Sequence, residues 1–199
     1  MFPVMLNLAG KLVAVVGGGP VGMRKLAAVL ECGAVARVID PRSLSGLPSG
    51  VRHVCEPYRA PHLDGAALAF ACAPPEVNAR VVGDGRARGV WVNAATAPSD
   101  GDFTLPAVVR RGDFTLSVST GGAAPALARR VREKLEAEFD ATFAEWVRLL
   151  AELRAEVLAT VPDETRRREL LDAFADWHWL ARLRTEGADA VRAAMRKSV

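Results

Sequence analysis

The stretch LVAVVGGGPVGMRKLAAVLECGA, which spans residues 12–34, decides the fold of this chain. Its first five residues are apolar and uncharged, three glycines follow, and Met23, Leu26 and Leu30 then recur at helical spacing. A short uncharged apolar run predicts a strand buried on both faces, and the later spacing predicts an amphipathic helix that stops at Gly33. The segment therefore predicts a strand, a tight glycine turn and a helix in succession.

Gly17, Gly19 and Gly22 form a GxGxxG pattern in that turn. The pattern is typical of Rossmann domains: the first glycine permits the turn, the second lets the backbone approach a pyrophosphate, and the third lets the helix pack on the strand. The N–H groups and the positive dipole end of the helix then face the phosphates. A glycine-rich turn without a ligand is the alternative, and the flanking strand and helix favour dinucleotide binding.

Asp40 ends the next apolar run of the chain. A carboxylate at this place accepts hydrogen bonds from the ribose hydroxyls of adenosine, which favours NAD over NADP. Arg42 lies two residues later and weakens that preference. We predict NAD as the cofactor.

Short apolar runs separated by glycine and proline continue to about residue 100. They predict strands over residues 36–40, 68–73 and 90–95, and residues 75–89 predict a second helix. Strands that alternate with helices imply right-handed βαβ units on a parallel sheet. We therefore expect an α/β Rossmann domain over residues 1–112.

The middle third changes character, because residues 102–120 predict two strands around an Arg-Gly-Asp turn. A long helix follows, with Ser119 or Thr120 as its cap and Pro125 in its first turn. Beyond it the chain is helical in pattern and nearly free of glycine, which predicts a helical domain over residues 146–199.

A second glycine site, comprising Ser119, Thr120, Gly121 and Gly122, joins a strand to that long helix. Consecutive N–H groups at such a junction predict an anion pocket. Basic residues cluster around it in sequence, namely Arg110, Arg111, Arg129, Arg130, Arg132 and Lys134. This charge indicates a receptor for a polycarboxylate or a phosphate. A solvated helix face with a capping turn explains the same residues, and the two interpretations stay open.

Composition excludes several classes of protein. The 199 residues include 26 Lys and Arg against 23 Asp and Glu, and a net charge of +3 is too small for a nucleic-acid interface. No run of about 18 apolar residues occurs, and the N-terminus lacks the pattern of a signal peptide. The three cysteines lack CxxC spacing, and His53, His62 and His178 are isolated, so we predict no resident metal site. We expect a cytoplasmic protein without nucleic-acid or membrane partners.

Taken in order along the chain, these landmarks resemble one family. GGGPVGMRK (residues 17–25), VNAATAPSDGDFTLP (residues 92–106) and STGGAAPALAR (residues 119–129) are similar to the N-terminal module of siroheme synthase. This is the precorrin-2 dehydrogenase/sirohydrochlorin ferrochelatase family, and the similarity covers about residues 2–139. The third motif is the most informative, because it is not generic to Rossmann domains.

The resemblance implies NAD-dependent oxidation of precorrin-2 to sirohydrochlorin, followed in many members by insertion of ferrous iron as a substrate. It also implies a homodimer built through a small α+β dimerisation segment, residues 113–145. The implied contacts with NAD are Pro20, Val21, Pro41 and Arg42, beside the glycines and Asp40. The implied contacts with the tetrapyrrole are Asn93, Thr96, Ser119, Thr120, Gly121 and Gly122.

The chain departs from the family at Thr96. The family carries a functional aspartate in VNVVDxP, where this chain has VNAATAP, and that carboxylate is thought to act as a general base and has been linked to metal insertion. Threonine is not an anionic base at neutral pH. Asp100, Asp102 or a water held by Thr96 are the candidate replacements, and a purely structural role is the alternative for both carboxylates.

Two other functions stay open. Because of Thr96, the chain is also compatible with a protein that binds NAD and a tetrapyrrole without oxidising the tetrapyrrole. An ordinary dehydrogenase of small hydroxy acids has less support, since no catalytic histidine with an aspartate partner follows the glycine-rich half. The residues do not indicate whether siroheme or a cobalamin is the end product.

Overall fold

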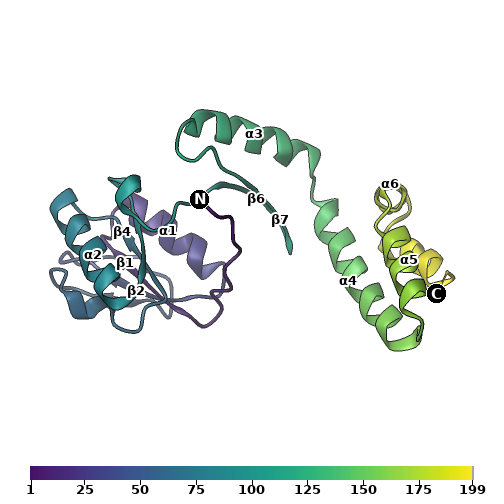
Figure 1. Ribbon diagram of the computed structural model, residues 1–199, viewed down its shortest axis with the longest axis horizontal. Coiled ribbons are helices and arrows are strands. Elements are labelled where there is room, and N and C mark those ends of the chain that lie inside the picture. Colours follow the sequence, from purple (N-terminus) through teal and green to yellow (C-terminus); the bar gives the residue numbers. More distant parts are fainter. Residues whose placement is uncertain (199) are drawn as a thin grey trace. The chain divides into compact units, whose positions relative to one another are not determined.

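The computed structural model describes residues 1–198, which form two compact units (Figure 1). The first unit runs from Met1 to Leu105, and the second begins at Pro106. Within the described residues, every helix is too short or too polar to cross a membrane.

A parallel five-stranded sheet forms the first unit, in the order β3-β2-β1-β4-β5. The strands are β1 (Leu12–Val16), β2 (Val35–Ile39), β3 (Arg52–Val54), β4 (Leu68–Ala71) and β5 (Trp91–Ala94). Val13 pairs with Ala36 of β2 and with Leu68 of β4, so β1 is central. The strand order reverses between β1 and β4, and open α/β sheets bind ligands at such a switch point.

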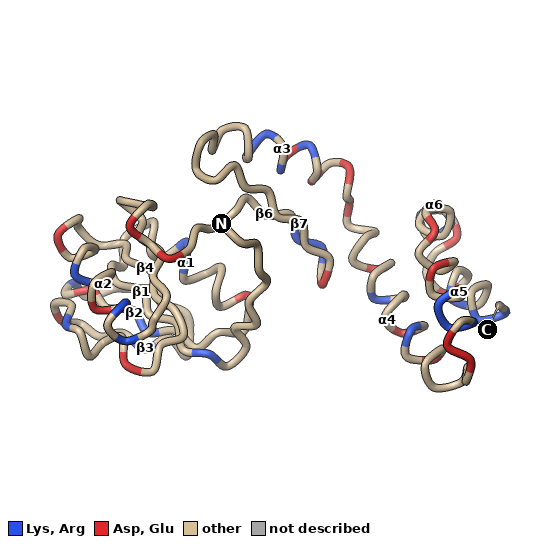
Figure 2. Tube along the Cα trace, viewed as in Figure 1, with Lys and Arg blue, Asp and Glu red and all other residues tan. Residues whose placement is uncertain are grey.

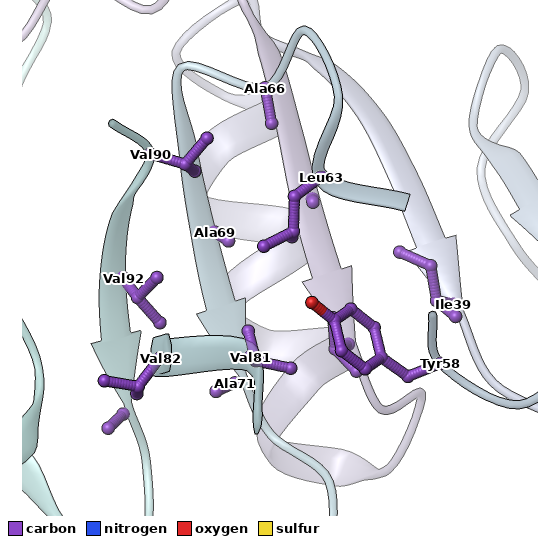
Figure 3. Packing of buried hydrophobic residues seen from close by; sticks show 13 residues of the cluster. Ile39, Tyr58, Leu63, Ala66, Ala69, Ala71, Val81, Val82, Val90 and Val92 are labelled. Carbon is purple, nitrogen blue, oxygen red and sulfur yellow. The ribbon is translucent and has the colours of Figure 1, made fainter. Parts of the chain in front are cut away.

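Helices cover both faces of this sheet, which makes three layers. They are α1 (Pro20–Leu30) on one face, and α2 (Pro75–Arg88) with the 3-10 helix η1 (Ala60–Leu63) on the other. Because strand side chains alternate, Val13 and Val15 pack with Leu26 of α1 on one face of the sheet. Ala14 and Val16 belong to the apolar cluster on the other face, to which α2 contributes side chains (Figure 3). Burial of a valine or leucine side chain contributes about 1.5–3 kcal/mol.

The predicted Rossmann architecture is confirmed, and the strands expected over residues 36–40, 68–73 and 90–95 lie within two residues of these ends. Strand β3 was not predicted from the sequence, because its residues Arg-His-Val contain no apolar run. The strand pairs with β2 over only three residues. Tertiary pairing, not local pattern, makes this segment a strand.

The second unit begins with the antiparallel pair β6 (Ala107–Arg111) and β7 (Phe114–Val118), as the Arg-Gly-Asp turn predicts. Its helices are α3 (Pro125–Glu138), α4 (Thr142–Thr160), α5 (Glu164–Phe174), α6 (Trp177–Glu186) and α7 (Ala188–Arg196). Helices α4 to α7 share one apolar cluster that includes Phe143, Leu153 and Phe174. The expected helical region is therefore packed around a core of its own.

Candidate functional site

The glycine loop between β1 and α1 needs glycine for reasons of space. Gly17 has φ +101°, and a Cβ there would lie 2.4 Å from the carbonyl oxygen of Cys72. A Cβ on Gly22 would lie 1.9 Å from the carbonyl oxygen of Gly17. Gly19 differs, because a Cβ there would meet nothing within 4 Å. The first and third glycines close the turn, and the second leaves open space above the backbone.

That open space adjoins the N-terminus of α1. Gly19 is the N-cap residue and carries no side-chain cap, no acidic side chain occupies the first turn, and Pro20 and Val21 are exposed. Unpaired N–H groups and the helix dipole attract anions at such an end. The loop lies at the β1–β4 switch point, and its geometry therefore fits the pyrophosphate of a dinucleotide.

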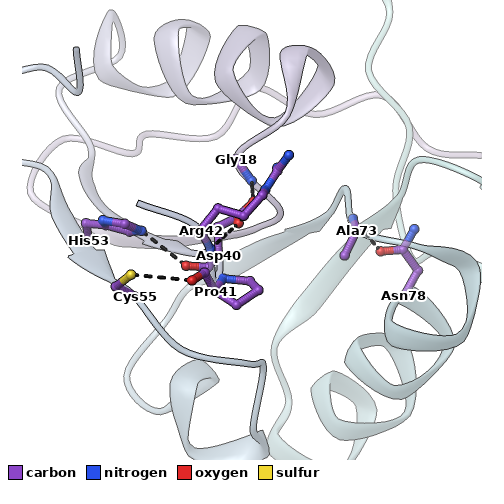
Figure 4. A network of polar contacts seen from close by, with 8 residues as sticks. All are labelled: Gly18, Asp40, Pro41, Arg42, His53, Cys55, Ala73 and Asn78. Carbon is purple, nitrogen blue, oxygen red and sulfur yellow. Dashed lines mark hydrogen bonds and ion pairs between the residues drawn. The ribbon is translucent and has the colours of Figure 1, made fainter. Parts of the chain in front are cut away.

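Asp40, directly after β2, is held from several sides (Figure 4). It is 3% exposed, and it accepts hydrogen bonds from the backbone N–H of Gly18 at 2.7 Å and of Arg42 at 2.9 Å. The guanidinium of Arg42 donates to both carboxylate oxygens, at 3.0 and 2.9 Å. These contacts, chiefly the side-chain bond from Arg42, hold the pKa of Asp40 well below its usual range. Pro41 and Arg42 are exposed beside the glycine loop, as an adenosine contact requires.

Asn93, on β5, contacts a lysine that the sequence analysis missed. Lys25 of α1 donates from Nζ to Asn93 Oδ1 at 2.7 Å, and Asn93 Nδ2 donates to the carbonyl oxygen of Phe103 at 2.8 Å. Nζ also lies 5.0 Å from the centre of the Phe70 ring. Burial lowers the pKa of Lys25 and raises the pKa of the neighbouring Cys72 thiol.

A sequence signal for Lys25 exists. Residues 22, 25, 26 and 29 follow the i, i+3, i+4, i+7 pattern of one helix face, and Gly22, Leu26 and Val29 of this set are buried. A lysine on the apolar face of a helix predicts a hydrogen-bond partner for its ammonium group in the protein interior, since an unpaired buried charge is costly.

Thr96 follows β5 and is held by the buried Asn78 of α2. Asn78 Nδ2 donates to Thr96 Oγ1 at 3.0 Å, and Asn78 Oδ1 accepts the N–H of Ala73, the second residue after β4, at 2.9 Å (Figure 4 shows the latter pair). The Thr96 hydroxyl accepts in this bond, so its own proton is left for another acceptor. Asn78 thus joins the carboxyl ends of the two strands.

The two candidate carboxylates near Thr96 differ. Asp102 Oδ2 accepts the N–H of Val92 at 2.8 Å, and the N–H of Asp102 donates to the carbonyl oxygen of Val92 at 2.7 Å. Asp102 therefore anchors its segment to β5. Asp100 is exposed in the 3-10 helix η2 (Pro98–Asp100), and its side chain contacts the Ser99 hydroxyl at 3.4 Å.

In the second unit, the loop Ser119–Gly122 uses several of its polar groups internally. Ser119 Oγ accepts the N–H of Gly121 at 3.2 Å, and Thr120 Oγ1 accepts that of Ala124 at 3.1 Å. The expected cap at Ser119 or Thr120 is wrong, because Ala124 is the N-cap of α3. Gly121 and Gly122 have φ of +63° and +89°, which turns the chain before the helix starts, and the hydroxyls stabilise this turn.

The basic residues around that loop are partly neutralised, and Figure 2 shows Lys and Arg alternating with Asp and Glu along α3. Arg129 and Arg132 lie within 4.0 Å of Glu133, and Arg132 also pairs with Glu136. Arg111 donates to the carbonyl oxygens of Glu136 and Phe139, both at 3.0 Å, and so caps the last turn of α3. The helix-face interpretation accounts for these three arginines.

No group of three or more His, Cys, Asp or Glu side chains that could hold a metal ion occurs within residues 1–198. Predicted site residues of the first unit occur in two clusters, and the second of these includes Lys25, which was not predicted. One joins Asp40 and Arg42 to the glycine loop, and the other joins Asn93 to Lys25.

Two family models match the chain. The model described as "Putative NAD(P)-binding" matches residues 4–107, and the model described as "Sirohaem biosynthesis protein central" matches residues 111–138. The second match contains the STGGAAPALAR motif, and the first contains the glycine loop.

Curated relatives are named siroheme synthase. The protein of Pseudomonas fluorescens strain SBW25 is 38% identical over an alignment of 172 residues, which covers 83% of this chain and 37% of that protein. Siroheme synthase 1 of Halorhodospira halophila is 34% identical over an alignment of 183 residues, which covers 88% of this chain and 38% of that protein. The chain therefore spans less than half the length of these relatives.

A solved structure titled "SirC, precorrin-2 dehydrogenase" has a similar fold. It is 25% identical in sequence with a TM-score of 0.78, and the match covers 99% of this chain and 100% of that chain. The similarity agrees with the predicted α/β architecture and extends through the helical second unit.

Proposed function

The chain belongs to the NAD(P)-binding family whose model spans residues 4–107, and from that premise we propose that it oxidises precorrin-2 to sirohydrochlorin with NAD. The substrate loses a hydride, which converts NAD to NADH, and a proton, which passes to a base or to water. The names of the similar proteins, siroheme synthase and precorrin-2 dehydrogenase, support this substrate. The cytoplasm, which holds NAD, is the proposed location.

The glycine loop carries the proposal. Gly17 and Gly22 are required by backbone contacts of 2.4 and 1.9 Å, whereas Gly19 leaves open space at the N-terminus of α1. A turn with no ligand would need glycine only at positions 17 and 22. The α1 N-terminus would hold the pyrophosphate, and NAD, when bound, supplies the acceptor for the hydride.

Thr96 contacts the substrate in this proposal, since it is exposed and follows β5 at the carboxyl edge of the sheet, where parallel sheets bind ligands. Asn93 is buried and bonded to Lys25 and Phe103, so it acts by positioning this edge. Lys25 fixes the Asn93 amide, and Asn78 fixes the Thr96 hydroxyl as an acceptor. Thr96 therefore donates its proton to a ligand oxygen and does not remove a proton from the substrate. A carboxylate of the tetrapyrrole is a matching acceptor.

Proton acceptance falls to Asp100 or to water. Asp102 is a weaker candidate, because its carboxylate anchors the chain to Val92. Without a carboxylate at position 96, we expect slow insertion of ferrous iron, which enters as a substrate.

An anaerobic assay with enzymatically prepared precorrin-2 and NAD tests the proposal. A joint rise of NADH absorbance and the sirohydrochlorin spectrum is the expected result. Ferrous iron added afterwards to the same cuvette measures chelation. If NAD binds but neither signal rises, the dehydrogenase proposal fails.

The threonine at position 96 favours a second candidate function, in which the protein binds NAD and the tetrapyrrole without oxidising the tetrapyrrole. Thr96→Asp distinguishes the two functions, since the buried Asn78 amide can donate to a carboxylate as it does to the hydroxyl. Activity that appears only in this variant supports the non-catalytic protein. Activity in the native chain excludes it.

A homodimer through residues 113–145 is part of the proposal. The pair β6–β7 is a two-stranded sheet, which is marginal alone, and Leu127 on the neighbouring α3 is 54% exposed. Residues 111–138 match the model described as "Sirohaem biosynthesis protein central", which supports the same role for this segment as in the proteins of that family. Light scattering on the purified chain should give twice the monomer mass, and a monomer would exclude the dimer.

A further inference from the structure

The side chain of Arg42 covers the carboxylate of Asp40 (Figure 4). Arg42 Nε donates to Oδ1 at 3.0 Å and Nη2 donates to Oδ2 at 2.9 Å. The backbone N–H groups of Arg42 and Gly18 add one bond to each oxygen, at 2.9 and 2.7 Å. Each oxygen thus accepts two hydrogen bonds, which fills the roughly four acceptor positions of a carboxylate.

This arrangement changes the role expected of Asp40. An NAD ribose needs an acceptor for its 2′-hydroxyl, and the Asp40 side chain is only 4% exposed with its acceptor positions occupied. While Arg42 stays in place, Asp40 does not offer an acceptor to a ribose. Its carboxylate instead ties Arg42 to the glycine loop.

Arg42 has the complementary property. Its side chain is 70% exposed, and two of the five N–H groups of a guanidinium bind Asp40, which leaves three for another acceptor. The segment after β2 also packs on the glycine loop, because a Cβ at Gly18 would lie 2.3 Å from Leu44 Cδ1. The guanidinium is therefore held beside the loop that fits the pyrophosphate.

We propose that Arg42, held by Asp40, forms a site for the 2′-phosphate of NADP, so that the chain accepts NADP as well as NAD. The inference rests on the dinucleotide site of the proposed function and specifies the adenosine end of that site. Pairing with Arg42 neutralises the Asp40 charge, which would otherwise repel a phosphate. A guanidinium binds phosphate oxygens with charge-assisted, directional hydrogen bonds. NADP accepts the same hydride as NAD, so the chemistry is unchanged.

Calorimetric titration of the full chain with two fragments isolates this site. Adenosine 5′-monophosphate and adenosine 2′,5′-bisphosphate differ only in the 2′-phosphate, and neither contains nicotinamide. The same titrations with NAD and NADP relate the fragments to the whole cofactors. All are run at one ionic strength, since phosphate binding depends on salt.

Three variants complete the design. Arg42→Ala removes the guanidinium, and Arg42→Lys keeps the charge without its fork. Arg88→Ala is the matched control, because Arg88 also pairs with an aspartate, Asp64, at 3.2 Å, but lies at the end of α2 that precedes β5. That end is opposite the glycine loop, since the loop follows the carboxyl end of β1.

In the native chain and in Arg88→Ala, we expect the bisphosphate to bind at least about tenfold more tightly than the monophosphate. Arg42→Ala should abolish this preference, and Arg42→Lys should keep part of it. Equal binding of both fragments by the native chain, or a preference that survives Arg42→Ala, overturns the proposal. If no fragment and no dinucleotide binds, the proposed function fails with it. Binding as expected without turnover of precorrin-2 contradicts the proposed function alone.

Discussion

Alanine at Gly19, the N-cap of α1, and at Gly22, in its first turn, should have different consequences, because the space around the two glycines differs. At Gly22 a Cβ would lie 1.9 Å from the carbonyl oxygen of Gly17, and backbone cannot rotate away as a side chain can. At Gly19 the Cβ would enter open space, and φ is −75°, which alanine adopts freely. Gly22→Ala should therefore damage the fold, and Gly19→Ala should damage cofactor binding.

The magnitude follows from the contact at Gly22. Since Cβ atoms essentially never approach closer than 3.0 Å, α1 must move by about 1 Å from the loop, and overpacking of this severity costs about 3 kcal/mol. The better helix propensity of alanine returns about 1 kcal/mol. The net loss of about 2 kcal/mol should lower Tm by roughly 8 °C for a unit of about 100 residues. Gly19→Ala should change stability by less than about 1 kcal/mol.

Thermal unfolding followed by circular dichroism, with NAD titration by calorimetry, measures both effects. Gly19→Ala should retain the native Tm and weaken NAD binding at least about tenfold, because its methyl group occupies the space of the pyrophosphate. A native Tm for Gly22→Ala would refute the argument about close approach. Native NAD affinity for Gly19→Ala would refute the assignment of the open space to the cofactor.

Three further outcomes are expected. Lys25→Met removes the hydrogen bond to the Asn93 amide, so kcat/KM for precorrin-2 should fall at least about tenfold. The Kd for NAD should stay within about threefold, and equal changes in kcat/KM and Kd would indicate a general structural defect. Asn78→Ala leaves the half-buried N–H of Ala73, after β4, without its acceptor and should cost about 1–3 kcal/mol in urea unfolding. A loss below about 0.5 kcal/mol would contradict the importance of that bond. The pKa of Asp40 is lowered in the folded state, so its stabilisation is full above the unfolded pKa of about 3.9 and declines as the pH falls further. The stability difference between the native chain and Arg42→Ala should accordingly shrink from pH 6 to pH 3 in urea titrations, and a constant difference would refute this linkage.

The fold could be predicted from the sequence because its signals are local. An uncharged run such as Leu12–Val16 has few alternatives to a buried strand, and a helix that opens at Pro20 after a glycine turn is specified by neighbouring residues. The hairpin around Gly112 is likewise encoded by alternation and a turn. Strand β3 has no such signal and exists because β2 offers it a partner.

The sequence by itself determined the glycine loop, the parallel sheet and the helical second unit, since spacing and side-chain type within a few residues suffice for each. Only the tertiary structure decided the state of the polar groups. Asp40 meets the N–H of Gly18, which is 22 positions away, Lys25 meets Asn93 across 68 positions, and Asp102 anchors β5 instead of standing free. Hydrogen bonds of this kind depend on distances set by the packing of whole elements, and residue order alone does not contain those distances.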